Sequence, residues 1–186
     1  AEFDIIKDLT FKADVGVDAV TVRYNRRSVD IVDADEVARE VVRPNSKGLK
    51  ELISHFGQSI LNKNNTLNRG ALRTLIFADD NAKNTVNTIL HPLIREEMLN
   101  QLHNTMSQYC ILSAPLLLEN KLQNLVGQIL VIDIPESLQL ERTLSRDGGN
   151  ITTIKSIMRS QVTREQRLAM ADDIIDNSRS INNLKP

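Results

Sequence analysis

Short apolar runs bounded by polar turn residues recur along the chain, and this pattern predicts buried parallel strands. Such runs lie at 4–6, 29–33, 109–113 and 128–133, with a weaker one at 173–176. Between them, apolar residues recur every three or four positions, which predicts amphipathic helices. Strands that alternate with helices indicate an α/β fold, in which a parallel sheet is flanked by helices through right-handed crossovers.

Most of the predicted helices carry their own start and stop signals. Ser46 and Asn68 fit the N-cap position, because a side-chain oxygen there accepts a hydrogen bond from a free amide of the first turn. Gly57 ends the helix that Ser46 begins. Further helices are expected at 36–42, 82–90, 92–104 and 136–146, followed by two short basic helices. Pro92 and Pro135 are each assigned to the first position of a helix, where no backbone N–H is needed.

Two stretches are longer than a plain alternation of strands and helices requires. Roughly seventy residues of nearly pure helix separate the second and third strands, whereas a crossover needs only ~10–15. This stretch predicts an inserted helical lobe, and a second, arginine-rich helical excursion precedes the last strand. We therefore expect a core of residues 1–35, 109–141 and 171–186, a helical lobe of residues 36–108, and a small helical lid of residues 142–170.

Composition narrows the classes of protein that fit this fold. The 186 residues include 23 Lys and Arg against 24 Asp and Glu, so the net charge of -1 gives no case for a nucleic-acid or membrane-surface protein. Aromatic residues make up only 3%, which argues against stacking platforms for bases. A single cysteine excludes an internal disulfide. No apolar run approaches the ~20 residues needed to span a bilayer, and no signal-peptide pattern is visible. We expect a cytoplasmic protein with no nucleic-acid or membrane partner.

Two aspartates stand where the second predicted strand ends. Asp33 and Asp35 flank Ala34 at this point, and ligands of open α/β sheets bind beyond the carboxyl ends of strands. A carboxylate there could accept a proton from a substrate hydroxyl or help to hold a magnesium ion. The alternative is that one of the two merely caps the following helix, and the spacing alone favours this simpler role.

Other candidate residues also have two interpretations each. Arg142 and Arg146 lie one helical turn apart and suit phosphate binding through their guanidinium forks, or they form a solvated basic face with Glu141 and Asp147. Glu119 follows the third strand and lies either near the same crevice as the aspartates or on the surface of an apolar loop. His91 begins a predicted helix, where a lone histidine is more often structural than catalytic.

Taken together, these segments resemble the dephospho-CoA kinase family of small P-loop kinases. The matching motifs follow the family's order and spacing over most of the chain, at 32–35, 67–69, 90–94, 115–119, 142–147 and 171–177. The resemblance implies a P-loop kinase-like fold whose helical insert (36–108) binds coenzyme A and whose lid (142–170) closes over ATP. The implied reaction transfers the γ-phosphate of ATP, with Mg²⁺, to the ribose 3′-hydroxyl of dephospho-CoA, the last step of coenzyme A synthesis.

The resemblance also assigns roles to single residues. It implies that Asp35 is the base facing the 3′-hydroxyl. The implied contacts to dephospho-CoA come from Asp33, His91, Leu117 and Glu119. The implied contacts to ATP come from Thr10, Gly16, Arg142, Arg146 and Asn177.

The chain departs from the family pattern in the phosphate-binding loop. Residues 11–19 read FKADVGVDA, where the family has a glycine-rich loop that ends in Gly-Lys-Ser/Thr. Val17 stands in place of the lysine and Asp18 in place of the hydroxyl residue, while Asp14 adds a negative charge. We therefore expect weak ATP binding. The alternative function is a non-catalytic protein that binds CoA or dephospho-CoA and has lost its phosphate loop.

Overall fold

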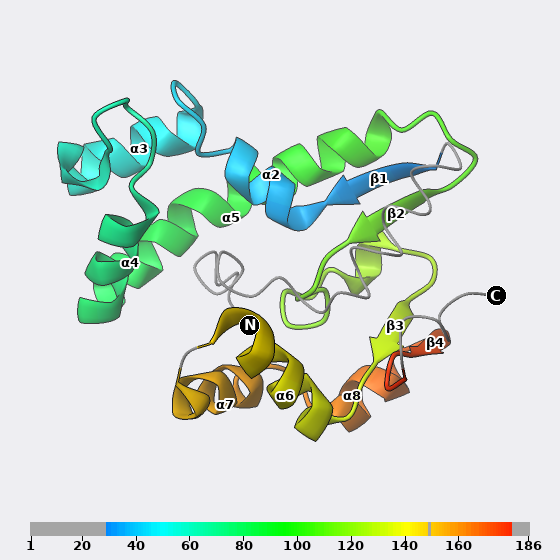
Figure 1. Cartoon of the computed structure of the whole chain (residues 1–186). Helices are drawn as coiled ribbons and strands as arrows, with labels where there is room; N and C mark the ends of the chain where they lie inside the picture. Colours follow the sequence, from blue (N-terminus) through cyan, green and yellow to red (C-terminus); the bar gives the residue numbers. More distant parts are fainter. Residues whose placement is uncertain (1–28, 149, 180–186) are drawn as a thin grey trace. The chain divides into compact units, whose positions relative to one another are not determined.

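The structure is a computed structural model that describes residues 29–148 and 150–179. These residues form two compact units, 29–114 and 115–179. Each unit contains one pair of parallel strands with helices between them along the chain (Figure 1). The expectation of an α/β fold with parallel strands is confirmed, while the first predicted strand, at 4–6, lies outside the described residues.

In the first unit, β1 (Asp30–Asp33) pairs with β2 (Cys110–Ser113), and Asp33 lies opposite Ser113. Both strands match the predicted runs to within one residue. Hydrogen bonds from the amides of Met106 (2.6 Å) and Ser107 (2.9 Å) to Oδ2 of Asp30 hold the start of β1 to the segment before β2. These bonds, with that of Ser107 first, lower the pKa of Asp30.

Four α-helices connect β1 to β2 in this unit: α2 (Ala34–Glu40), α3 (Lys47–Phe56), α4 (Arg69–Ala78) and α5 (Asp80–His103), with a short 3₁₀ turn at Gln58–Ile60. The predicted caps are confirmed, because Ser46 accepts the amide of Leu49 and Asn68 accepts that of Ala71. α2, α3 and α4 all pack against α5 (Figure 1). The long helix α5 is therefore the support on which the other three are placed.

The prediction of two helices separated near Pro92 is wrong, since α5 runs unbroken from Asp80 to His103. Proline removes one backbone hydrogen bond and disfavours helix at the residue before it. Val86, Leu90, Ile94 and Met98, four residues apart on both sides of the proline, are all buried in the core. Burial of this continuous apolar stripe outweighs the local cost, while the proline ring itself faces solvent.

In the second unit, β3 (Leu130–Asp133) pairs with β4 (Asp173–Asp176). Both strands were predicted, although β3 begins two residues later than expected. Between them lie the helices α6 (Glu136–Asp147), α7 (Ile151–Arg159) and α8 (Arg164–Ala169), and a 3₁₀ turn at Gln123–Leu125 precedes β3. Pro135 is the N-cap of α6, one position before the predicted place. α7 packs on α6, whereas α8 packs on β3 (Figure 1). Within the described ranges, no helix is long and apolar enough to cross a membrane.

Candidate active site

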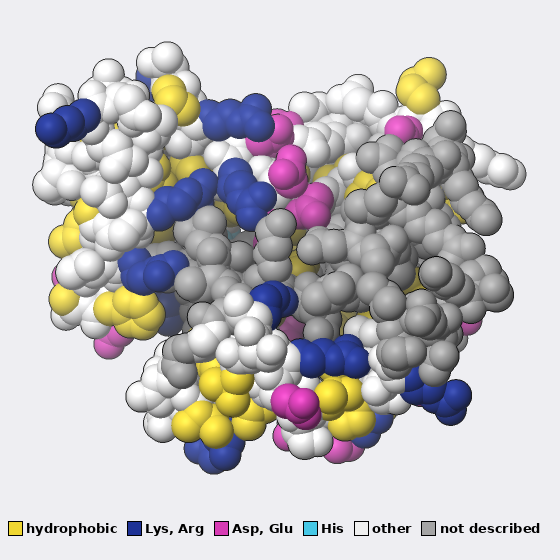
Figure 2. Space-filling view, in the orientation of Figure 1, with side chains coloured by type: hydrophobic (Ala, Val, Ile, Leu, Met, Phe, Trp, Pro, Cys, Tyr) yellow, Lys and Arg dark blue, Asp and Glu magenta, His cyan; other side chains and the backbone are white. Residues whose placement is uncertain are grey.

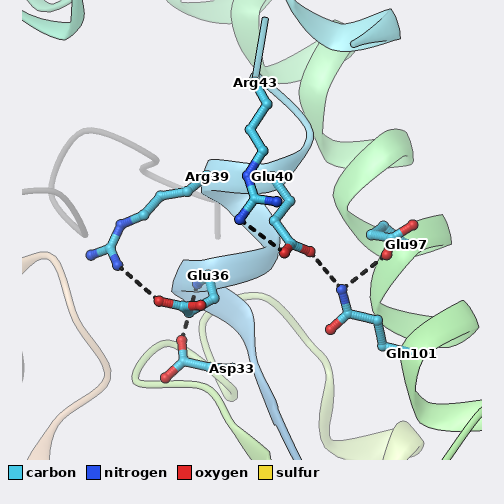
Figure 3. Close-up of polar contacts among 7 residues, drawn as sticks. All are labelled: Asp33, Glu36, Arg39, Glu40, Arg43, Glu97 and Gln101. Carbon is cyan, nitrogen blue, oxygen red and sulfur yellow. Dashed lines mark hydrogen bonds and ion pairs between the residues drawn. The ribbon is translucent and has the colours of Figure 1, made fainter.

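Asp33 is the last residue of β1 and the N-cap of α2. Its Oδ1 accepts the amides of Asp35 (2.9 Å) and Glu36 (3.1 Å), the latter drawn in Figure 3. The capping role weighed for this pair is therefore confirmed for Asp33. Because the cap satisfies two free amides, α2 begins at Ala34, two residues before the predicted start.

Asp35 lies in the first turn of α2 and is half-buried. A negative charge in this turn is stabilised by the positive end of the helix dipole. The carboxylate thus stands just beyond the carboxyl end of β1, at the edge of a parallel sheet where substrates bind. A carboxylate at this position has the chemistry of a general base.

A polar network holds α2 in place behind these aspartates (Figure 3). Gln101 on α5 donates from Nε2 to Glu40 (2.7 Å) and to Glu97 (2.9 Å). Two further pairs are more exposed: Glu36 with Arg39 at 3.5 Å, within α2, and Glu40 with Arg43 at 3.2 Å, just past its end. Exposed pairs contribute little to stability, so among these polar contacts the bridge from α5 to Glu40 does most to hold α2 against α5.

In the same unit, the surroundings of Arg69 disfavour the charged form of its side chain. Arg69, at the start of α4, is half-buried, and its pKa is lowered first by burial and then by the positive charge of Arg39. No ion pair or hydrogen bond of its guanidinium is found with the described part of the chain. Figure 2 shows several Lys and Arg side chains on the visible face of this unit. An anion beside Arg69 would offset both effects.

His91 lies on α5, half-buried between the fully buried Leu90 and the exposed Pro92. It belongs to the same unit as Asp33 and Asp35. The other predicted site residues that the structure describes, from Leu117 to Asn177, belong to the second unit. Thr10 and Gly16 lie outside the described residues.

Glu119 is buried, so its alternative placement on the surface of a loop is wrong. Its Oε1 accepts the amide of Val162 at 3.0 Å, which ties the turn after β2 to the segment between α7 and α8. The carbonyl of Leu117 accepts the amide of Leu122 (2.9 Å) and closes that turn. The carboxylate thus anchors the chain just before α8.

The predicted ATP contacts lie on α6 and after β4. Arg142 is half-buried and donates from Nη2 to the carbonyl of Arg179 at 3.2 Å, while Arg146 is exposed one turn later. Asn177 is buried, and its amide donates to the carbonyl of Asp133 at 2.8 Å. Its side-chain Nδ2 is buried and has no hydrogen-bond partner among the described residues. A buried donor of this kind is costly unless a ligand accepts from it.

An ion pair at the end of β3 is absent from the sequence-based predictions. Arg164, the first residue of α8, donates from Nε to Oδ1 of Asp133 (2.8 Å) and from Nη2 to Oδ2 (2.5 Å). This fork, opposed only in part by burial, lowers the pKa of Asp133. The two residues are 31 positions apart, and no local pattern in the sequence connects them.

A metal ion would need several acidic, His or Cys side chains that lie close together. Within residues 29–148 and 150–179, no group of three or more His, Cys, Asp or Glu side chains could hold one. The capping bonds already occupy Oδ1 of Asp33.

Solved structures place the chain in a class. A dephospho-CoA kinase from Campylobacter jejuni matches with a TM-score of 0.71 and 25% identity, over 94% of this chain and 88% of that one. The Thermus thermophilus protein TT1252 gives the same TM-score at 22% identity, over 92% and 88% of the two chains. The fold, with its parallel strand pairs and helical insertions, is that of the P-loop kinases, as expected.

Sequence comparison then gives the family. The family model described as dephospho-CoA kinase matches residues 8–183. The dephospho-CoA kinase of Pseudoalteromonas translucida is 44% identical over 95% of this chain and 84% of its own length. That of Vibrio cholerae is 45% identical over 88% and 81%. The chain belongs to the dephospho-CoA kinase family, and the expected kinase and transferase classes are confirmed.

Proposed function

We propose that this chain catalyses the ATP-dependent phosphorylation of the ribose 3′-hydroxyl of dephospho-CoA, the last step of coenzyme A biosynthesis. The observation that carries the proposal is the position of Asp35. In a member of this family, a carboxylate follows directly on β1, in a helix whose start is fixed by the Asp33 cap and whose body is held by Gln101.

Dephospho-CoA is assigned to the helical residues 36–108. Asp33 and His91 would contact it, and so would Leu117 and Glu119. Glu119 also accepts the amide of Val162. The half-buried Arg69 beside Arg39 supports this assignment, because a ligand that carries phosphates would relieve the repulsion between the two guanidinium groups.

ATP is assigned to the core and the lid. Arg142 and Arg146 would contact its phosphates from α6, and the unpaired amide of Asn177 would lie near the adenine. Thr10 and Gly16 belong to the loop that would hold the phosphates, and Mg²⁺ would arrive bound to the nucleotide.

In the proposed reaction, Asp35 accepts the proton of the 3′-hydroxyl as that oxygen bonds to the γ-phosphorus. The bond from the γ-phosphorus to the β–γ bridging oxygen breaks, and ADP leaves with the electron pair. The guanidinium groups of Arg142 and Arg146 would stabilise the negative charge that spreads over the transferred phosphoryl group and the leaving ADP. Asp35 thus supplies base catalysis, and the arginines supply electrostatic stabilisation.

The second candidate function is a non-catalytic protein that binds CoA or dephospho-CoA. The sequence of the phosphate loop favours it, because Val17 and Asp18 replace the lysine and the hydroxyl residue of the family. Binding of dephospho-CoA by residues 36–108 is common to both functions, so only phosphoryl transfer separates them.

The test of Asp35 is its replacement by asparagine in a version with a family-type phosphate loop. We expect Asp35→Asn to lower kcat by about 10²–10⁴-fold and to change the affinity for dephospho-CoA little. Asp80→Asn is the matched control, since Asp80 is an exposed acid in the first turn of α5. Equal kcat values for the two variants would return Asp35 to a purely structural role.

A further inference from the structure

We propose that Asp133 and Arg164 are positioning residues that clamp the two ends of the α6–α7 pair, and thereby set the direction in which Arg142 and Arg146 point. The inference rests on the proposed function only in its last step, which assigns these two arginines to ATP.

The clamp joins the residue where the chain leaves the sheet to the residue where it returns. Asp133 ends β3, two residues before Pro135 caps α6, and Arg164 begins α8. Both carboxylate oxygens are engaged, at 2.8 and 2.5 Å. A bidentate pair fixes an angle as well as a distance, because the guanidinium and the carboxylate must be coplanar.

A second contact holds the chain just before Arg164. Oε1 of the buried Glu119 accepts the amide of Val162, two residues before Arg164. Thr163 and Gln166 form a capping box that fixes the first turn of α8. The start of α8 is thus held by the ion pair, by Glu119 and by its own cap. It therefore belongs with β3 and not with the α6–α7 pair.

The packing of the helices separates α8 from the α6–α7 pair in the same way. α8 packs on β3, whereas α7 packs on α6 (Figure 1). The α6–α7 pair therefore leaves the sheet as one body, and its two ends meet at the clamp. Arg142 and Arg146 lie in the second half of α6, so a small rotation of this helix at its start shifts both residues. The bond from Nη2 of Arg142 to the carbonyl of Arg179 also holds that side chain to the segment after β4, so Arg146 should respond more strongly.

The charges around the clamp keep it formed at neutral pH. Arg167, one turn along α8, also lowers the pKa of Asp133. The pKa of Arg164 is raised first by its hydrogen bonds to Asp133 and further by the charges of Glu165 and Glu136. Asp133 is thus held as the anion by two arginines. Although it stands at a strand end like Asp33, its lone pairs are occupied, so a positioning role fits it better than that of a base.

The test measures amide hydrogen exchange along the full chain, without ligand, in five proteins. These are the parent chain, Asp133→Asn, Arg164→Lys, the double variant Asp133→Asn/Arg164→Gln, and the control Arg159→Gln. The double variant removes both charges of the pair, so neither partner is left unpaired, which protects the test against a variant that fails to fold. Arg159 is an exposed arginine at the end of α7, so its variant removes the same charge without touching the clamp.

We expect exchange in 136–159 to be about tenfold faster in Asp133→Asn and in the double variant, and unchanged in β3, β4 and residues 29–114. Arg164→Lys, which keeps the charge but not the fork, should fall between these variants and the parent chain. Arg159→Gln should match the parent chain. Faster exchange throughout 115–179 would mean that the pair only stabilises the unit, and unchanged exchange in 136–159 would mean that it positions nothing. Either result would overturn the proposal.

A binding measurement separates this proposal from the proposed function. Calorimetry should give a dissociation constant for MgATP about tenfold higher in the double variant than in the same protein with the clamp intact, and little change for dephospho-CoA. Both proteins carry a family-type phosphate loop for this measurement. If a chain with that loop and an intact clamp transfers no phosphoryl group, the proposed function is wrong. The hydrogen-exchange measurement still tests the clamp in that case. Equal loss of affinity for both ligands would count against the clamp.

Discussion

Two helical glycines in the first unit should respond oppositely to the same substitution by alanine. Gly48 lies buried in the first turn of α3, and a Cβ built on it would lie 2.4 Å from the carbonyl oxygen of Val41. It would also lie 3.1 Å from Cδ2 of Leu90 and 3.3 Å from Cδ1 of Leu93. Gly70, in the first turn of α4, would bring its Cβ no closer than 3.4 Å to another group, Oδ1 of Asn68.

The expected magnitudes come from two opposing effects. Alanine favours helix over glycine by roughly 0.5–1 kcal/mol, and this gain applies at both positions. At Gly48 it is opposed by overpacking of about 1–3 kcal/mol, since a backbone oxygen at 2.4 Å must move. We therefore expect Gly48→Ala to lower the free energy of unfolding by about 1–2 kcal/mol, and Gly70→Ala to raise it by about 0.5 kcal/mol.

The assay is urea unfolding of the full chain, followed by circular dichroism and by tritium or deuterium exchange in α3 and α5. Leu90 and Leu93 flank His91, so Gly48→Ala should also weaken dephospho-CoA binding, while Gly70→Ala leaves it unchanged. If Gly48→Ala proves as stable as Gly70→Ala, the close packing of α3 on α5 described above is wrong.

Three further outcomes follow from the site. The folded pKa of Asp133 lies below its ordinary value of 3.8, so its stabilisation of the fold is complete above that value and is lost as the pH falls through the folded pKa. Asp133→Asn should therefore make the stability depend less on pH in acid, as followed by the fluorescence of a bound dye. An unchanged dependence on pH would refute this. Arg146→Ala should weaken ATP binding more than dephospho-CoA binding by calorimetry, and equal losses would leave Arg146 on a solvated face. Arg69→Gln should not lower the unfolding temperature without ligand but should weaken dephospho-CoA binding, whereas a fall in stability would show that the guanidinium is already satisfied.

Sequence signals predict the structure correctly where residues next to each other in the chain determine it. Ser46 and Asn68 cap their helices because an oxygen at the N-cap reaches amides only two or three residues away. The strand at 173–176 also forms where its short apolar run predicts it. Pro92 misleads because the burial that keeps α5 continuous through it comes from packing against α2, α3 and α4, which the local pattern around the proline does not show.

The site is predicted less completely than the fold. Asp33 and Asp35 are visible as candidates because a strand end and a helix start meet there, and this junction is local. Glu119 and the Asp133–Arg164 pair depend on contacts across 43 and 31 residues, which no spacing rule encodes. The effect of Arg39 on the pKa of Arg69 likewise depends on how α2 and α4 pack on α5.

The phosphate loop is where the two candidate functions differ most. As written, the loop has Val17 at the position of the family's lysine, and Asp14 and Asp18 would repel the phosphates at close range. Dephospho-CoA should still bind this chain, because its proposed lobe is separate in sequence. A restored loop should recover ATP binding and transfer together, since the backbone amides and the lysine act on the same phosphates. Val17→Lys alone should recover much less.

The most direct measurement is phosphoryl transfer from ATP to dephospho-CoA, with the product identified by mass spectrometry and phosphorus NMR. It compares the chain as written with a version restored in its loop by Phe11→Gly, Lys12→Gly, Asp14→Gly, Val17→Lys and Asp18→Ser. We predict little turnover from the first and a product phosphorylated on the ribose 3′-hydroxyl from the second, lost again on adding Asp35→Asn. A restored chain that binds both substrates and forms no such product, or that forms it undiminished with Asp35→Asn, would contradict the account.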